Sequence, residues 1–200
     1  MAETGKLIAL EGIDGAGTTT QCELLAKALT AKGMAVYTTA EPSKGPIGQL
    51  LRRALRREEP LDDMALVPLF AADRLDHVTR EIAPKLAEGV HVITDRYVLS
   101  SLAYQSLIAP LDYVRAVNEH ARHADLTVYV KVSPPVAEKR RKARGGVAER
   151  FDAKSHQEQI AQRYDHALHL AAPNVTIDGD AGIEAVHEEI LVHVLELIRG

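Results

Sequence analysis

The feature that most constrains this chain is the segment of residues 7–20, LIALEGIDGAGTTT. It begins with an apolar run short enough for a strand buried on both faces, and a helical pattern follows it. Between them lie three glycines, Gly12, Gly15 and Gly17. A strand, a glycine-rich loop and a helix form the context of a phosphate-binding loop, in which backbone N–H groups and the helix N-terminus surround an anion. The segment therefore predicts nucleotide binding by Gly12, Ile13, Asp14, Gly15, Ala16, Gly17, Thr18, Thr19 and Thr20.

One charged residue is missing from this loop. The pattern G-x-x-x-x-G-K-[ST] fits from Gly12 to Gly17 and then fails, because Thr18 stands where the lysine belongs. Thr19 occupies the position whose hydroxyl coordinates magnesium in such loops. The alternative is an ordinary strand-to-helix connection in which Thr18 or Thr19 is the helix N-cap.

Composition restricts the class of protein. The chain has 200 residues, of which 46% are hydrophobic and 26% charged, and this fits one globular domain over residues 1–200. A formal net charge of -4 argues against broad nucleic-acid binding, and no apolar run approaches transmembrane length. With one cysteine and no secretory signal, the sequence predicts a cytoplasmic protein that binds neither nucleic acid nor membrane.

Strand-like and helical patterns alternate along the rest of the chain. Strand-like runs fall at residues 7–10, 34–39, 90–94, 126–130 and 175–177, and helical patterns lie between them. This alternation predicts an α/β fold, a doubly wound five-stranded parallel sheet flanked by helices. The helical stretch 62–88 contains Pro68 and Pro84, which we expect to bend or divide it.

The same topology predicts where the chemistry lies. Ligands of doubly wound sheets gather at the carboxyl ends of the strands. The loop 12–20, the loop 41–44 and the pair Asp95 and Arg96 each follow one of the first three predicted strands. We therefore expect them to meet along one rim of the sheet.

Five segments resemble the thymidylate kinase family in order and spacing. They are EGIDGAGTTTQ, AEPSKGPIG, LFAADRLDH, TDRYVLSSLAYQ and RRKARGGVAERFD, and the resemblance runs from Leu7 to about Gly179. It implies a P-loop kinase fold with a mobile lid at about residues 140–152. It also implies direct in-line transfer of the γ-phosphoryl of ATP to dTMP, giving dTDP and ADP, with Mg²⁺ held by Thr19 and Asp95. A homodimer is implied as well.

The resemblance extends to the acceptor site. It implies that Phe70 stacks on thymine and that Arg74, four residues later on the same helix face, reaches a base oxygen. Asp14 would contact the sugar, and Arg96 the acceptor phosphate. The other implied dTMP-binding residues are Glu41, Lys44, Ser100, Tyr104 and Gln105, with Tyr104 near C2′ and Lys44 as a substitute for an arginine that many relatives carry at position 40.

A basic cluster surrounds Gly145 and Gly146. Its members are Arg140, Arg141, Lys142, Arg144 and Arg150, and it resembles the family's lid, with glycines as a hinge. Together with Gly15, it resembles the form of the family in which the P-loop carries glycine and the lid supplies cations. The implied catalytic residues are Asp95, Arg96, Arg140 and Arg144, which would position and neutralise the transferring phosphate. Arg140, Arg144 and Lys44 are candidates to replace the missing lysine.

Two other functions remain open from the sequence. One is a kinase for another nucleotide on the same fold. The other is a nucleotide-binding regulatory pseudokinase that lost catalysis together with the lysine. Measured phosphoryl transfer separates the pseudokinase from both kinases, and a panel of acceptors separates the two kinases.

Overall fold

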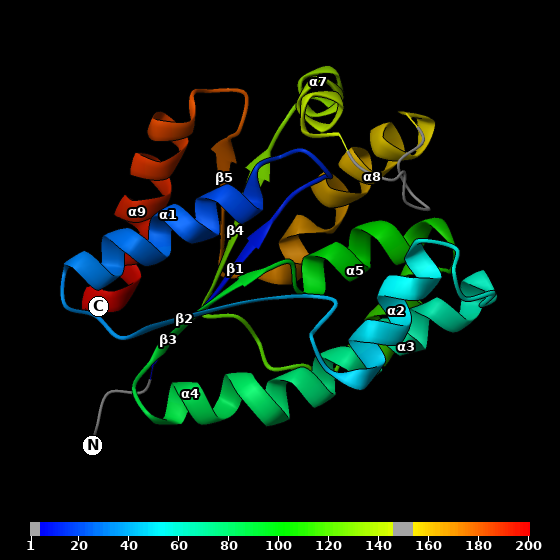
Figure 1. Cartoon of the computed structure of the whole chain (residues 1–200), viewed down its shortest axis with the longest axis horizontal. Coiled ribbons are helices and arrows are strands. Elements are labelled where there is room, and N and C mark those ends of the chain that lie inside the picture. The colour runs from blue at the N-terminus through cyan, green and yellow to red at the C-terminus, as the bar shows by residue number, and fades with distance from the viewer. Residues whose placement is uncertain (1–4, 146–153) are drawn as a thin grey trace.

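A computed structural model describes residues 5–145 and 154–200, which fold around one parallel sheet (Figure 1). The strands are β1 (Leu7–Glu11), β2 (Val36–Ala40), β3 (His91–Asp95), β4 (Leu126–Lys131) and β5 (Asn174–Asp178). They lie in the order β2-β3-β1-β4-β5, and every neighbouring pair is parallel. The predicted five-stranded parallel sheet is confirmed.

Helices cover both faces of the sheet. They are α1 (Thr18–Ala31), α2 (Pro46–Leu55), α3 (Asp63–His77), α4 (Ala83–Ala87), α5 (Val98–Tyr104), α6 (Leu111–Val117), α7 (Pro134–Arg144), α8 (Lys154–Ala167) and α9 (Ile183–Arg199). Short 3₁₀ turns, Gln105–Leu107 and Leu168–Ala171, extend α5 and α8. Helix α1 packs against α9, α5 against α8, and α2 against α3. Within the described residues no helix is long and apolar enough to cross a membrane.

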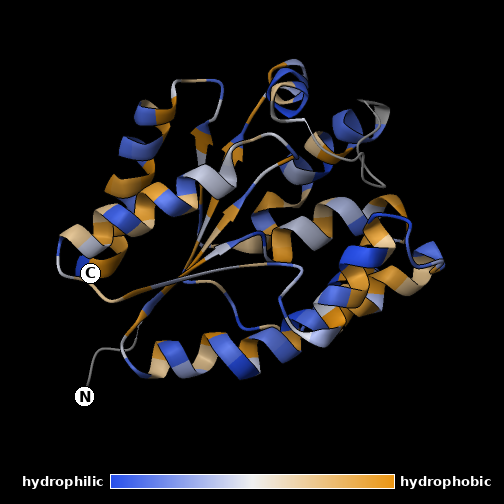
Figure 2. Ribbon diagram, viewed as in Figure 1, coloured by the Kyte–Doolittle hydropathy of each residue, from blue (hydrophilic) through white to orange (hydrophobic). Residues whose placement is uncertain are grey.

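The core forms on the two faces of the central strands. All five residues of β1 are buried, so the strand is apolar along its length rather than alternating. Leu7 and Ala9 belong to a cluster that includes Leu86 of α4, whereas Ile8 and Leu10 belong to the larger cluster that includes α1, α5 and α9. Figure 2 shows these strands as a hydrophobic centre beneath helices with mixed surfaces.

Two expected boundaries shift for local reasons. Strand β2 begins at Val36 rather than Met34, because the Met34 N–H still bonds the Leu29 carbonyl at the end of α1. The stretch 62–88 is divided near Pro84, where the π-helical turn Val78–Ile82 precedes α4. Proline lacks an N–H and crowds the carbonyl four residues earlier, so a widened turn is the expected relief. Helix α3 continues through Pro68, which is exposed, so water can reach the carbonyl it leaves unpaired.

The sheet order brings the predicted site segments together. Strand β1 lies between β3 and β4, so the chain reverses its winding direction at the carboxyl end of β1. The register pairs Asp95 with Leu10 on one side and with Ala40 on the other. The loops after β1, β2 and β3 therefore start side by side, as predicted.

Candidate active site

The P-loop connects β1 to α1 through two left-handed glycines. Gly15 and Gly17 have φ angles of 93° and 91°, a region that residues with a Cβ atom rarely adopt. Gly17 is the N-cap of α1, and no side chain caps the helix. The alternative with Thr18 or Thr19 as N-cap is therefore wrong. The first N–H groups of α1 are left for a ligand, which favours the anion-binding interpretation.

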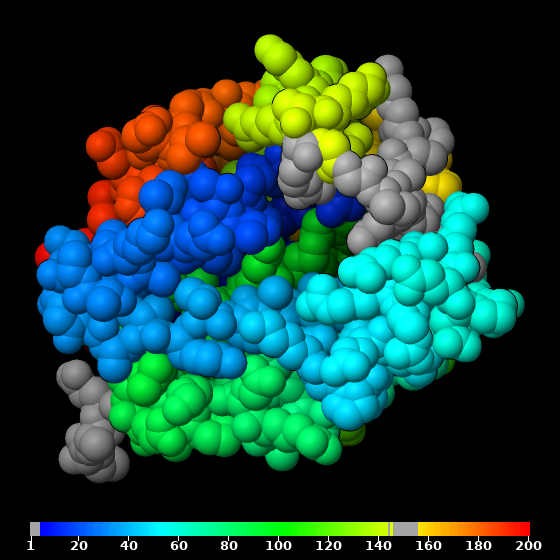
Figure 3. Space-filling model, viewed as in Figure 1, coloured from blue at the N-terminus to red at the C-terminus, as the bar shows by residue number. Residues whose placement is uncertain are grey.

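A cavity of about 490 Å³ lies beside this loop. It is lined by Ile13 to Gln21, by Asp95 at the end of β3 and Arg96 after it, by Arg140 and Arg141 of α7, and by residues after β5 that include Gly179 and Ala181. Figure 3 shows a hollow on this face of the molecule, between the blue N-terminal segment and cyan α2, with green chain at its floor. One cavity thus joins the loop to residues more than 150 positions away.

Asp95 and Thr19 both line this cavity and contact each other. The Thr19 hydroxyl donates to Oδ2 of Asp95. The other carboxylate oxygen, Oδ1, is buried and has no hydrogen-bond partner. An unpartnered buried carboxylate oxygen beside a hydroxyl suits Mg²⁺, which prefers oxygen ligands and keeps several of its waters. In the described part of the chain no group of three or more His, Cys, Asp or Glu side chains could hold a metal by itself.

Arg96 is the centre of a second group of side chains. Its Nη2 lies 2.6 Å from Oδ1 of Asp14, and its Nη1 donates to the Gly12 carbonyl at 3.1 Å and to Oγ of Ser100 at 3.2 Å. The Tyr104 hydroxyl lies 3.2 Å from Oδ2 of Asp14, and the Arg96 guanidinium lies 4.9 Å from the centre of the Tyr104 ring. Asp14, Arg96, Ser100 and Tyr104 are therefore brought together, adjoining the P-loop cavity.

Two members of this group come from α8 and were not predicted. The Tyr164 hydroxyl lies 2.8 Å from Oγ of Ser100 and donates to the Gly12 carbonyl at 3.0 Å. Gln157 approaches Oδ2 of Asp14 at 3.4 Å. The sequence offers one signal for Tyr164, namely an aromatic residue in the polar helix that follows the basic cluster. This signal does not show which strand end the tyrosine contacts.

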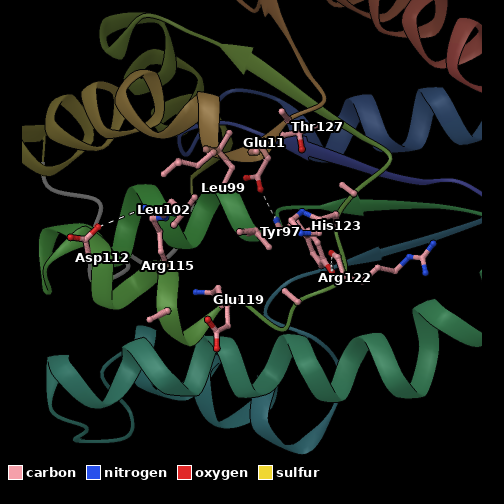
Figure 4. Close-up of a pocket in the computed structure, with 18 residues that line it drawn as sticks. Glu11, Tyr97, Leu99, Leu102, Asp112, Arg115, Glu119, Arg122, His123 and Thr127 are labelled. Atoms are coloured by element: carbon pink, nitrogen blue, oxygen red, sulfur yellow. Dashed lines mark hydrogen bonds and ion pairs between the residues drawn. The ribbon is translucent and has the colours of Figure 1, made fainter.

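Glu11, the last residue of β1, is a fully buried carboxylate beneath this group. Oε1 accepts from the N–H groups of Tyr97 at 2.8 Å and Ser100 at 3.1 Å, and Oε2 accepts from the Ser100 hydroxyl. Burial raises the pKa of Glu11 above its usual value, although the bonds from Ser100 and the charge of Arg96 oppose the shift. A second cavity, of about 530 Å³, reaches Glu11 and Tyr97 from the Leu99–Leu102 face of α5 (Figure 4).

A raised pKa has a consequence for stability. The stabilisation from protonated Glu11 is complete below its unfolded-state pKa and is lost as pH rises through the higher folded-state pKa. We therefore expect Glu11→Gln to flatten the decline in unfolding free energy that begins as pH rises above about 4, the usual pKa of a glutamate, measured by urea denaturation. Glu189→Gln, at an exposed position of α9, is the control and should leave the pH profile unchanged. A Glu11→Gln profile parallel to that of the wild type would contradict this prediction.

Residues of helix α3 hold the loop after β2 through buried polar contacts. Nε and Nη2 of Arg74 lie 2.9 and 2.7 Å from Oε2 of Glu41, and Arg74 is 1% exposed. The same guanidinium donates to the Tyr97 carbonyl at 2.9 Å and to Asn118. Asp73, its neighbour in α3, accepts from the N–H and the hydroxyl of Ser43, at 2.6 and 2.5 Å. The loop after β2 is thus held in one position by residues of α3.

Three of the predicted acceptor residues lie apart from the Arg96 group. Phe70 is half-buried against the cluster of Leu51, Ala54 and Leu66. Lys44 is exposed, and Gln105 is buried in the 3₁₀ turn after α5. Among the described residues, no hydrogen bond or ion pair joins these three side chains to Asp14 or Arg96.

The predicted lid is described only up to Gly145. Nη1 of Arg140 lies 3.4 Å from the Ala16 carbonyl oxygen, and Nη1 of Arg141 lies 2.5 Å from that of Asp14. Arg144 ends α7. Its side chain, together with Arg150 and the other residues at 146–153, lies outside the described part of the chain.

The comparisons with known proteins agree with this geometry. A sequence model of the family named thymidylate kinase matches residues 10–190. The chain belongs to the thymidylate kinase family. A probable thymidylate kinase of Pyrobaculum aerophilum is 38% identical over 195 residues, covering 96% of this chain and 95% of the relative. The thymidylate kinase of Xanthomonas campestris pv. campestris strain B100 is 36% identical, covering 98% and 87%.

A solved structure shares the fold. The thymidylate kinase of Candida albicans superimposes with a TM-score of 0.84, covering 98% of this chain and 93% of the other, at 23% sequence identity. The family membership makes this chain a thymidylate kinase, an enzyme that phosphorylates dTMP, as predicted. The predicted P-loop kinase fold is confirmed as well.

Proposed function

We propose that this thymidylate kinase family member transfers the γ-phosphoryl of ATP to dTMP, giving dTDP and ADP, in the cytoplasm. The observation that carries the proposal is one cavity in which the P-loop and Asp95 lie next to the group of Asp14, Arg96 and Tyr104. The first half suits a triphosphate donor and the second a phosphorylated sugar acceptor. In-line transfer needs both substrates in such an arrangement and little covalent chemistry from the protein.

The acceptor is proposed to bind across the Arg96 group. Arg96 would hold the phosphate of dTMP, exchanging its contact with Asp14 for one with the ligand, and Asp14 would accept the sugar hydroxyl. Tyr104, fixed by Asp14, would lie against C2′ and exclude ribonucleotides. Phe70 and Arg74 remain the proposed thymine contacts, with Ser100, Gln105, Glu41 and Lys44 as the other proposed acceptor residues. Glu41 would act through Arg74, whose guanidinium it holds.

The donor site is proposed to hold Mg²⁺ together with ATP. Thr19 and Asp95 would hold the ion, because the unpartnered Oδ1 of Asp95 offers a ligand or an acceptor for a metal-bound water. When bound, Mg²⁺ would neutralise phosphate charge. Gly15 and the basic end of α7 support the form of the family with a glycine in the P-loop and a basic lid, in which Arg140 and Arg144 contact the phosphates.

Asp95→Asn tests the metal site. We expect the Mg²⁺ concentration that gives half-maximal activity to rise by about 10- to 100-fold, because the amide offers a metal or its waters a weaker, uncharged oxygen. The measurement is a Mg²⁺ titration of initial rates at fixed ATP and dTMP. Asp165→Asn, which removes an exposed partner of Lys131, is the matched control. An unchanged Mg²⁺ requirement in Asp95→Asn would remove this residue from the proposed site.

The function itself is tested by ADP formation with ATP, Mg²⁺ and a panel of acceptors. We expect dTMP to give the highest kcat/KM, ahead of dUMP, dCMP, AMP and ribothymidine monophosphate. A higher value for another acceptor would favour a kinase of different specificity. Binding of ATP without ADP formation from any acceptor would favour the pseudokinase.

We also propose a homodimer formed through α3. Met64, Pro68 and Leu75 lie within about 40° of one another around this helix and are exposed, and Tyr113 of the neighbouring α6 is exposed as well. We expect Leu75→Glu to shift the sedimentation coefficient from that of a dimer to that of a monomer. Val192→Glu, an equally apolar exposed position on α9, should leave it unchanged. A wild-type chain that sediments as a monomer would refute the dimer.

A further inference from the structure

The P-loop lacks its lysine, and Thr18 cannot replace the charge. Thr18 is the first residue of α1 and is 7% exposed, so it offers the cavity at most a hydroxyl. A lysine at this place normally reaches the β- and γ-phosphates. Another cation therefore has to reach the same phosphates if the donor site described above is to work.

Helix α7 packs directly on the P-loop at the glycine in its middle. A Cβ atom on Gly15 would lie 2.5 Å from the carbonyl oxygen of Ala137 and 3.1 Å from Cγ of Arg141. Real Cβ atoms do not approach a backbone oxygen so closely, so only glycine at position 15 permits this packing. In Figure 1, α7 lies above the loop that joins β1 to α1.

This close approach places two guanidinium groups on the carbonyls that flank Gly15. Nη1 of Arg141 lies 2.5 Å from the Asp14 oxygen, and Nη1 of Arg140 lies 3.4 Å from the Ala16 oxygen. Both arginines line the cavity that also contains Thr18 and Thr19. A guanidinium has five N–H donors in a planar fork, so a group that holds a loop carbonyl can also face a phosphate.

From this packing we propose that Arg141 supplies the phosphate-binding cation that the P-loop lysine would otherwise provide. The proposal rests on the donor site proposed above, and it concerns a residue outside the sequence-based candidates Arg140, Arg144 and Lys44. Arg141 makes the shorter of the two contacts with the loop, and its side chain lies against Gly15 itself. The three positions are then related. Gly15 lets α7 approach the loop, Thr18 leaves the lysine position without a charge, and Arg141 brings the cation to the phosphates from α7 instead of from α1.

The test is direct binding of AMP, ADP and the non-hydrolysable analogue AMP-PNP, with Mg²⁺, to the full chain by calorimetry. We expect Arg141→Ala to weaken AMP-PNP by about 10- to 100-fold, ADP less, and AMP less than two-fold. A merely structural role of Arg141 would weaken all three ligands alike, so the gradient with phosphate number identifies a phosphate contact. Arg141→Lys, which keeps a cation, should recover part of the loss. Lys139→Ala, which removes an exposed charge from the same helix, should change none of the affinities.

The decisive variant is Thr18→Lys in the Arg141→Ala background. If Arg141 stands in for the lysine, the double variant should regain at least five-fold in AMP-PNP affinity. Equal affinity of Arg141→Ala and wild type, an equal loss for AMP and AMP-PNP, or no recovery in the double variant would each overturn the proposal. These affinities are measured without an acceptor, so they do not depend on the proposed reaction. A wild-type chain that fails to phosphorylate dTMP would refute that reaction, and the affinities would still test the role of Arg141.

Discussion

Arg96→Ala is expected to lower kcat/KM for dTMP by about 10²- to 10³-fold, the usual cost of removing one preorganised donor from a transition-state charge. Arg96 links the P-loop, Asp14 and Ser100 through contacts of 2.6 to 3.2 Å. Its loss therefore removes the proposed phosphate contact and leaves Asp14 without its ion-pair partner. The measurement is steady-state ADP formation over a range of dTMP concentrations.

The effect of backbone strain at position 96 has to be distinguished from the effect of losing the guanidinium charge. Arg96 has a φ angle of 72°, a conformation that costs a residue with a Cβ atom roughly 1–2 kcal/mol. Arg96→Gly relieves this strain while it removes the same guanidinium. We expect the glycine variant to be at least as stable as the alanine variant and equally impaired in activity. An Arg96→Gly enzyme with near wild-type kcat/KM would show that the guanidinium is dispensable.

Arg74→Met is expected to lower the unfolding free energy by about 3–5 kcal/mol, because it leaves the carboxylate of Glu41 buried without its counter-charge. The methionine retains much of the apolar volume, so the loss reflects charge and hydrogen bonding more than a cavity. The Tyr97 carbonyl and Asn118 also lose donors in this variant. The measurement is urea denaturation at neutral pH, far from the usual pKa of a carboxylate.

Two further variants define the cause of that loss. Glu41→Gln in the Arg74→Met background removes the uncompensated charge and should recover at least 1 kcal/mol, about the value of one hydrogen bond or more. Arg80→Ala breaks an exposed pair with Asp76 and should cost less than about 1 kcal/mol. A loss in Arg74→Met no larger than that in Arg80→Ala would mean that the pair with Glu41 does not stabilise the fold.

Much of the architecture was predictable because it depends on local patterns. Strand-like runs predicted five strands, and all five appear within two residues of their expected ends, although the edge strands β2 and β5 are only partly buried. The glycines of the P-loop predict a turn that only residues without Cβ can make, and Gly15 and Gly17 have positive φ angles. The meeting of Asp14 and Arg96 also followed from sequence, because parallel topology brings the ends of neighbouring strands to one rim. Ser100 and Tyr104, which lie in α5, were expected there only from the family resemblance.

The contacts that the sequence could not predict join side chains far apart along the chain. Tyr164 reaches the Gly12 carbonyl across 152 positions, and Arg141 reaches that of Asp14 across 127. Neither contact is visible in a local pattern, because each depends on the order of strands in the sheet and on the angle at which a helix returns to it. The same is true of Glu11, whose burial raises its pKa only once α5 covers the end of β1.

The α/β fold, the phosphate-binding loop and the family were predictable from the amino-acid sequence, because periodicity, glycine positions and motif spacing are properties of short segments. The assembled fold was needed to show that Arg140 and Arg141 contact the loop that lacks a lysine and that Glu11 and Glu41 are buried. It also decided that Arg74 is held by Glu41 while Phe70 packs against α2. These outcomes depend on burial and on distances between elements, and both are properties of the assembled sheet and its helices.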